Sequence, residues 1–288
     1  MSHSDRRRLR HRPFAAEILY SRGETLCLAD LNTANLDTAV EDISKSNSTK
    51  SAKVSTTAVD ASDSAAVNVW IDAIITEYER LDCAANIAGI RDPFRPLREK
   101  SDEEWDRVMN VNAKGVFYCM RKECNVMKEG PSIVNACSMA GLQGTPGIGC
   151  YAASKHAAAG LTKTAAGEEG PRGIRNNGAG VFRIALCYGS RLVSLLHCKS
   201  GCVSNTDIWT AVALGVIRTQ MTACLHSADD KGGASGGDTE LLQSFLVRNA
   251  IKRMEEPEEV SRVIAFLLND DASFQTGTLV PVDGGYGC

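Results

Sequence analysis

The chain has 288 residues, of which 43% are hydrophobic and 23% charged, a composition typical of a soluble globular protein with a filled core. Its formal net charge of -3 argues against nucleic acid as the main partner, because phosphate binding needs a concentrated basic surface. No apolar run is long enough to cross a bilayer, so we expect no membrane partner.

The 11 cysteines are scattered singly, mostly within apolar stretches, and no secretory signal precedes them. We therefore predict reduced, buried thiols and a cytoplasmic protein. The closest pair, Cys198 and Cys202, has no second pair at the spacing of a zinc site, so we expect no metal.

Residues 1–13 are arginine-rich and precede any apolar segment, which favours a basic tail, with a weak organellar presequence as the alternative. From residue 14 the hydrophobic pattern becomes regular. In chain order, the expected elements are helix 14–22, strand 25–30, helix 36–43, strand 53–60, helix 64–78, strand 81–89, helix 102–127, strand 131–138 and helix 151–166.

Strands and helices thus alternate with short connections, the pattern of βαβ units. We predict an α/β fold, a single doubly wound Rossmann-like domain over 14–288 with a mostly parallel sheet. Such sheets bind ligands at the carboxyl ends of their strands. The segment 177–212 has no clear place in the alternation and is interpreted as an atypical insertion.

Three residues carry the strongest chemical signal: Ser138 at a strand end, then Tyr151, then Lys155 one helical turn later. A nearby ammonium lowers the pKa of a phenol, which makes a tyrosine usable as a general acid/base near neutral pH. The serine hydroxyl would hold the substrate oxygen. His156 and the tryptophans Trp70 and Trp105 are interpreted as structural.

In their setting, SMAG…CYAASKHAAAGLTK, these residues resemble the active-site motif of the short-chain dehydrogenase/reductase family. NVNAKGVF supplies Asn112, which completes the family's catalytic tetrad with Ser138, Tyr151 and Lys155. The C-terminal stretch RMEEPEEVSRVIAFLLNDDASFQTGTLVPVDGGY is similar to the family's last helix and strand. The resemblance implies an NAD(P)-dependent oxidoreductase that interconverts a secondary alcohol and a ketone.

The resemblance also implies cofactor contacts. Asp30 would receive the adenosine ribose, which favours NAD over NADP because a carboxylate repels the 2′-phosphate. The expected cofactor-binding residues are Asp30, Asp60, Asn86 in the NNAG-like NIAG, Tyr151, Lys155, and Ile217 and Thr219 in the PGxxxT-like LGVIRT. Residues 220–247 would form a substrate lid.

Two departures from the family pattern leave alternatives open. The phosphate-binding TGxxxGxG loop and a complete first strand are missing, because Arg10 and Arg12 stand near its last two glycines. The sheet is therefore expected to lose a central strand. Both this departure and the insertion at 177–212 could reflect gene-model errors or real divergence. Real divergence keeps a non-catalytic binding or scaffold protein as the alternative function.

Two further interpretations concern the substrate and the assembly. A sugar-nucleotide epimerase of the extended family is disfavoured by the short region after Thr219. The segment TLCLADLNTANLDTAVEDISKSN…LDCAANIAGI resembles reductases of fungal specialised metabolism, such as chanoclavine dehydrogenases, which implies a largely apolar small-molecule alcohol or ketone in secondary metabolism. The resemblance also implies a homo-oligomer formed through the helices that carry Asn112 and Tyr151.

Overall fold

The computed structural model describes residues 14–45, 52–128, 130–181, 194–198, 247, 249–253 and 255–287. The basic tail and nearly all of the expected lid lie outside these ranges. Seven strands form one sheet in the order β2-β1-β6-β3-β4-β5-β7. The strands are β1 (Thr25–Asp30), β2 (Val54–Ala58), β3 (Cys83–Asn86), β4 (Ser132–Ala136), β5 (Arg175–Val181), β6 (Ser194–Cys198) and β7 (Leu279–Val282).

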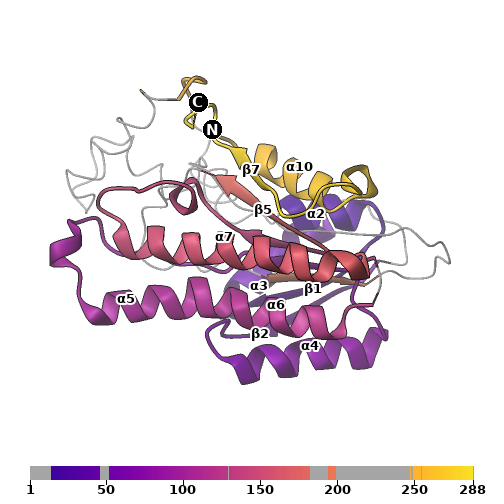
Figure 1. Ribbon diagram of the computed structural model, residues 1–288. Helices are drawn as coiled ribbons and strands as arrows, with labels where there is room; N and C mark the ends of the chain where they lie inside the picture. The colour runs from indigo at the N-terminus through magenta and orange to yellow at the C-terminus, as the bar shows by residue number, and fades with distance from the viewer. Residues whose placement is uncertain are drawn as a thin grey trace.

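Helices cover both faces of this sheet (Figure 1). The longer ones are α2 (Phe14–Ser21), α3 (Thr33–Ser44), α4 (Ser64–Tyr78), α5 (Asp102–Met109), α6 (Gly115–Val126), α7 (Gly149–Glu169) and α10 (Pro257–Leu267). Short turns are η1 (Leu97–Glu99), η2 (Asn110–Lys114), η3 (Met139–Gly141), η4 (Gly170–Arg172) and η5 (Asp270–Ala272).

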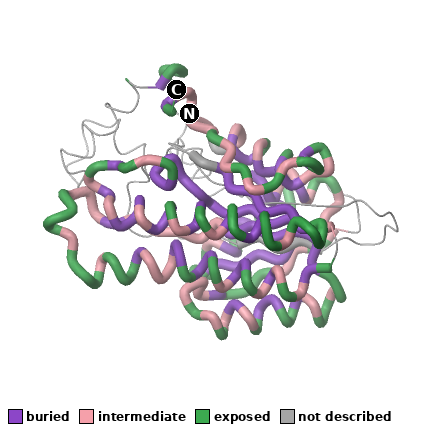
Figure 2. The backbone as a smooth tube through the Cα atoms, viewed as in Figure 1, coloured by how far each residue is buried: buried purple, intermediate pink, exposed green. Residues whose placement is uncertain are grey.

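The alternation of side chains along β1 shows how the two layers are filled. Leu26 and Leu28 pack with α2, α3 and α10, whereas Cys27 and Ala29 pack with α4, α6 and α7. All of β1 is buried, as expected for a central strand covered on both faces. In Figure 2 the buried backbone runs through the middle of the molecule, between the two helical layers. The predicted doubly wound, mostly parallel α/β fold is therefore confirmed.

Most predicted elements are present, with longer bounds for α3 and α7 than the sequence indicated. The sequence predicts a single helix over 102–127, whereas in the structure the π-helical turn η2 separates α5 from α6. Such a turn inserts one extra residue into the helix and often marks a functional position. Here it contains Asn112, whose side chain bonds a neighbouring loop.

The expected loss of a central strand is the larger difference. Strand β6 lies between β1 and β3 and pairs antiparallel with both, so the sheet is continuous. It lies within the segment 177–212, which the sequence indicates as an atypical insertion, whereas residues 177–181 of that segment belong to β5. The physical reason is that β1 and β3 are buried, and their facing backbone groups need partners.

Two further features concern the thiols and the helices. The described cysteines Cys27, Cys83, Cys119, Cys124, Cys137 and Cys150 are free thiols, and only Cys124 is more than slightly exposed. Within the part of the chain that the structure covers, no helix combines the length and apolar character that crossing a bilayer requires.

Candidate active site

The four residues of the expected tetrad gather where β3 and β4 end and α7 begins. Ser138 lies two residues after the end of β4, Tyr151 and Lys155 lie in the first half of α7, and Asn112 lies in η2. All four are buried, with exposures of 0% for Asn112, 1% for Ser138, 2% for Lys155 and 9% for Tyr151. Four polar side chains this deep need internal partners.

Asn112 joins the loop after β3 to helix α7. Its Oδ1 accepts a hydrogen bond from the backbone N of Ile90 at 2.8 Å, and its Nδ2 donates to the Ile90 oxygen at 2.8 Å. The same Nδ2 donates to Ser154 Oγ at 3.0 Å, and Ser154 precedes Lys155 on α7. The π-helical turn thus fixes two segments that flank the candidate site.

The Lys155 ammonium faces both the sheet and the phenol. Its Nζ donates to the backbone oxygen of Ala136, the last residue of β4, at 2.6 Å. It also lies 5.6 Å from the centroid of the Tyr151 ring. The remaining side of the ammonium faces Gly89, where a Cβ would come within 3.4 Å of Nζ. Glycine at this position leaves room beside the charged group.

Ser138 begins the turn η3, which packs directly on α7. Its Oγ accepts a hydrogen bond from the backbone N of Ala140 at 3.1 Å. At Gly141 an added Cβ would lie 2.6 Å from the backbone oxygen of Lys155. Only a residue without a side chain permits this contact, so the serine is held at a fixed distance from the helix that carries Tyr151 and Lys155.

One side of Tyr151 is apolar. Ala140, Ile148, Tyr151 and Ala152 form a buried cluster, and Phe94 from the loop after β3 packs against it. Apolar side chains beside a polar catalytic group exclude water and favour a hydrocarbon-like ligand. Phe94 was not among the predicted site residues, because nothing in the loop sequence indicates which helix it contacts.

A second part of the site lies at the carboxyl ends of β1 and β2. A cavity of about 40 Å³ there is lined by Asp30, Val59, Asp60, Trp70, Ala88 and Gly89, among others. Asp30 Oδ1 accepts from the backbone N of Asn32 at 2.8 Å, and its Oδ2 accepts from Asn35 Nδ2 at 3.1 Å. These bonds orient the carboxylate at the cavity. Asp60 Oδ1 accepts hydrogen bonds from the backbone N and from Oγ of Ser62, at 2.9 and 2.7 Å.

Gly89 connects the two parts, since it lines the cavity and also lies beside Asn112 and Lys155. The acidic end of β1, the adjoining cavity and the glycine next to the buried ammonium thus lie at the carboxyl ends of the strands, where sheets of this kind bind their ligands. Trp70, expected to be structural, is 5% exposed and lines the cavity as well.

Asn86 uses its side chain inside the protein. Its Nδ2 donates to Glu123 Oε2 and to Asn135 Oδ1, both at 3.0 Å, and Asn135 in turn donates to Thr162. Burial raises the pKa of Glu123 to about 8, so this carboxyl group is neutral near pH 7. This buried chain of polar side chains ties β3 and β4 to α6 and α7, and no local sequence pattern indicates it.

The other predicted residues fall outside this centre. His156 is exposed on α7, and its Nδ1 bonds the Ala152 oxygen of the same helix at 2.9 Å. Trp105 is 43% exposed on α5. Ile217, Thr219 and the arginines near the expected phosphate loop lie outside the described residues.

A tyrosine and a lysine one turn apart, supported by a strand-end serine and a helix asparagine on this sheet, define the class of short-chain dehydrogenases/reductases. The chain belongs to that family, whose members use NAD(P). A family model described as Enoyl-(Acyl carrier protein) reductase matches residues 14–183 and 210–287. The match leaves out the basic tail and residues 184–209, which lie within the expected insertion.

Individual relatives agree with this assignment. The short-chain dehydrogenase/reductase ABA4 of Pyricularia oryzae is 35% identical over 274 residues, covering 94% of this chain and 86% of the relative. A cyclohexanol dehydrogenase of an Acinetobacter species is 31% identical over 94% of this chain and 88% of its own. The crystal structure of a levodione reductase superposes with a TM-score of 0.70 at 29% identity, covering 94% and 91% of the two chains.

Proposed function

We propose that the protein is an NAD(P)-dependent oxidoreductase that interconverts a secondary alcohol and a ketone. The observation that carries this proposal is the buried Lys155 ammonium 5.6 Å from the Tyr151 ring. Burying an isolated charge is costly, so a lysine that is 2% exposed beside a phenol indicates a group retained for its chemistry.

In this proposal the protein's own groups position the substrate and move the proton. Tyr151 Oη gives a proton to the carbonyl oxygen during reduction and removes it from the hydroxyl during oxidation. Lys155 stabilises the phenolate, and the Ser138 hydroxyl holds the substrate oxygen. Asn112 fixes the loop after β3 to α7 through its bonds to Ile90 and Ser154. The nicotinamide supplies or accepts the hydride.

The described residues suit the adenosine half of the cofactor in particular. Asp30, oriented by Asn32 and Asn35, would bond the ribose hydroxyls, which favours NAD over NADP. Asp60 would lie near the adenine, and Asn86 would contribute by fixing the sheet beneath it. Lys155 and Tyr151 would contact the nicotinamide riboside, while contacts from Ile217 and Thr219 stay predictions.

The substrate is proposed to be a largely apolar, ring-containing alcohol or ketone. Phe94 and Ile148 provide an apolar wall next to Tyr151. One relative is named for cyclohexanol, a cyclic secondary alcohol. A role in secondary metabolism and a cytoplasmic location stay predictions from the sequence. A homo-oligomer is also proposed, because Trp105 and Phe117 expose 43% and 41% of their surface on α5 and α6.

The experiment is a titration of the purified chain with NADH and NADPH, followed by nicotinamide fluorescence, and then addition of a panel of cyclic and open-chain ketones. We expect saturable binding that favours NADH, and ketone-dependent loss of reduced nicotinamide. A folded protein that binds neither cofactor would overturn the proposal and support the scaffold alternative. The family's intact tetrad argues against that alternative, since a scaffold has no need of a buried ammonium beside a phenol.

A further inference from the structure

The loop between β3 and α5 contains a buried ion pair that the chemistry above does not use. Asp92 Oδ2 lies 2.6 Å from Lys100 Nζ, and the two side chains are 0% and 4% exposed. Removing two charges from water costs more than their attraction returns unless further hydrogen bonds satisfy them. The further hydrogen-bond partners of Asp92 and Lys100 therefore indicate which part of the structure the ion pair stabilises.

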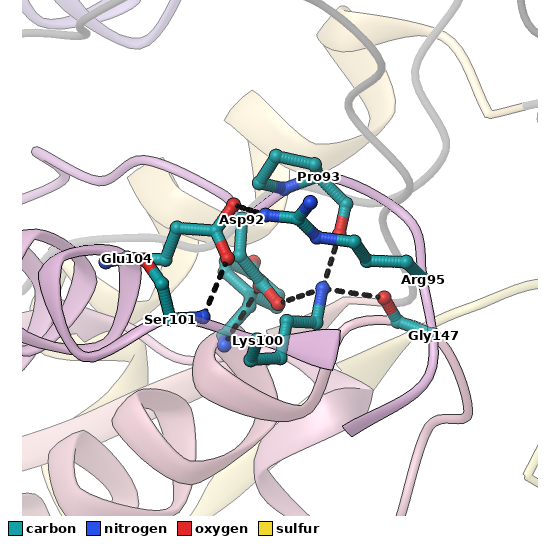
Figure 3. Close-up of polar contacts among 8 residues, drawn as sticks. Asp92, Pro93, Arg95, Lys100, Ser101, Glu104 and Gly147 are labelled. Atoms are coloured by element: carbon teal, nitrogen blue, oxygen red, sulfur yellow. Dashed lines mark hydrogen bonds and ion pairs between the residues drawn. The ribbon is translucent and has the colours of Figure 1, made fainter. Parts of the chain in front are cut away.

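Each partner belongs to a segment that shapes the candidate site. Asp92 Oδ1 accepts a hydrogen bond from the backbone N of Tyr151 at 3.0 Å. Lys100 Nζ donates to the backbone oxygen of Pro93, beside Asp92, and to that of Gly147 at 3.0 Å. Figure 3 shows Lys100 between the loop that carries Asp92 and Pro93 and the turn at Gly147. The pair thus joins two loops to the first turn of α7.

Helix α7 needs a hydrogen-bond acceptor from elsewhere in the protein for its first backbone N–H groups, because its own N-terminal residues supply none from their side chains. Its N-cap position is Ile148, which makes no side-chain cap bond, and its first turn has no acidic residue. The first backbone N–H groups of a helix have no partner within the helix and favour a nearby negative charge. Asp92 provides an acceptor from outside the helix, and it does so at the residue whose side chain is the proposed acid/base.

A second link holds the same loop from its other side. The guanidinium of Arg95 pairs with Glu104, whose carboxylate also accepts the backbone N of Ser101 at 3.1 Å to complete the capping box of α5. The backbone N of Arg95 donates to the Gly147 oxygen at 3.0 Å. The loop is therefore fixed to α5, which leads to Asn112, as well as to α7.

We propose that Asp92 and Lys100 are positioning residues. They hold the first turn of α7, and therefore the phenol of Tyr151, in the position from which it can exchange a proton with the substrate. This inference rests on the function proposed above. Asp92 acts through the backbone of Tyr151, and Lys100 acts by keeping Asp92 and the Gly147 turn in place. Phe94, between these two residues in the chain, is thereby held against Ile148 and Tyr151.

The test compares two double variants that both lack the ion pair. Asp92→Asn/Lys100→Met keeps an acceptor for the Tyr151 N–H, whereas Asp92→Leu/Lys100→Met has the same side-chain shape without the acceptor. Neither leaves a buried charge unpaired, so both are expected to fold. Asp92→Ala/Lys100→Met replaces the leucine variant should that variant not fold. The readouts are kcat and KM for ketone reduction, and backbone hydrogen exchange over residues 149–153.

We expect the leucine variant to lose about tenfold in kcat relative to the asparagine variant, since small misplacements of a reacting group carry costs of that order or more. KM for the cofactor should change less than about twofold, because the adenosine cavity is not touched. Exchange over the first turn of α7 should be faster in the leucine variant. Equal kcat values in the two variants would overturn the inference.

A control uses an ion pair elsewhere, in which the side chain of Asp72 is 59% exposed. Asp72 and Lys122 lie 2.5 Å apart between α4 and α6, so Asp72→Asn/Lys122→Met makes the same chemical change away from α7 and should leave both readouts unchanged. Should the wild-type chain turn over no ketone, the proposed function fails, and hydrogen exchange alone decides this inference. Equal exchange in the two Asp92 variants would then overturn it.

Discussion

Replacing Asn112 with alanine removes three hydrogen bonds from a residue that is 0% exposed. Two of these bonds, each 2.8 Å long, join Oδ1 and Nδ2 to the backbone N and O of Ile90. The third joins Nδ2 to Ser154 Oγ at 3.0 Å. Each such bond contributes on the order of 1 kcal/mol net, so we predict that Asn112→Ala lowers the free energy of unfolding by about 3 kcal/mol.

Urea denaturation followed by circular dichroism measures this difference. The control is Asn110→Ala, in the same π-helical turn, where the side chain is half-buried and makes none of these three bonds. We expect the control to cost less than about 1 kcal/mol, the usual effect of a substitution that removes no buried bond. Equal losses in the two variants would refute the argument that Asn112 ties the loop after β3 to α7.

Three further predictions concern a titrating group, a close packing contact and the cofactor. The pKa of Glu123 is about 8 in the folded protein against 4.5 for the free group, so the folded state binds the extra proton and its stability falls as pH rises between these values. Glu123→Gln should therefore gain stability relative to wild type across that window, by up to about 1.4 kcal/mol per pH unit in urea denaturation, and a stability difference that does not change with pH would contradict this reasoning. Gly141→Ala should lower the free energy of unfolding by more than about 1 kcal/mol and abolish most of the turnover, because the added Cβ would lie 2.6 Å from the backbone of α7. The control Gly144→Ala, where an added Cβ has nothing within 4 Å, should resemble wild type in thermal melts and rate assays. Asp30→Asn should shift the ratio of NADPH to NADH affinity by about tenfold towards NADPH in fluorescence titrations, and an unchanged ratio would contradict the ribose assignment.

The parts of the site that the sequence predicts are those encoded by local spacing. Tyr151 and Lys155 are one helical turn apart, and Asp30 ends a short apolar strand, so each position follows from the period of its own element. The capping box formed by Ser101 and Glu104 is likewise a local pattern, since the two residues are three positions apart in the chain. Short-range patterns carry this information without any knowledge of tertiary contacts.

The features that the sequence did not reveal depend on contacts between distant segments. Strand β6 pairs with β1 and β3, which precede it by more than a hundred positions, and its own sequence has no turn signals that mark it as a central strand. In the sequence, Asp92 and Lys100 look like ordinary charged residues of a loop. Their pairing and the bond from Tyr151 to Asp92 become visible only in the folded structure, where the loop packs on α7. The π-helical turn has the same apolar period as the helices beside it, so the pattern alone indicated one helix.

In the proposed reaction Tyr151 exchanges a proton while hydride moves between nicotinamide and substrate carbon. The most direct test is ketone reduction with NADH deuterated at the ring carbon that donates hydride, comparing wild type with Tyr151→Phe. We predict deuterium on the carbinol carbon of the product from wild type, and a loss of about a hundredfold or more in rate for Tyr151→Phe with NADH binding unchanged. Equal rates in the two proteins, or a product without deuterium, would contradict the account.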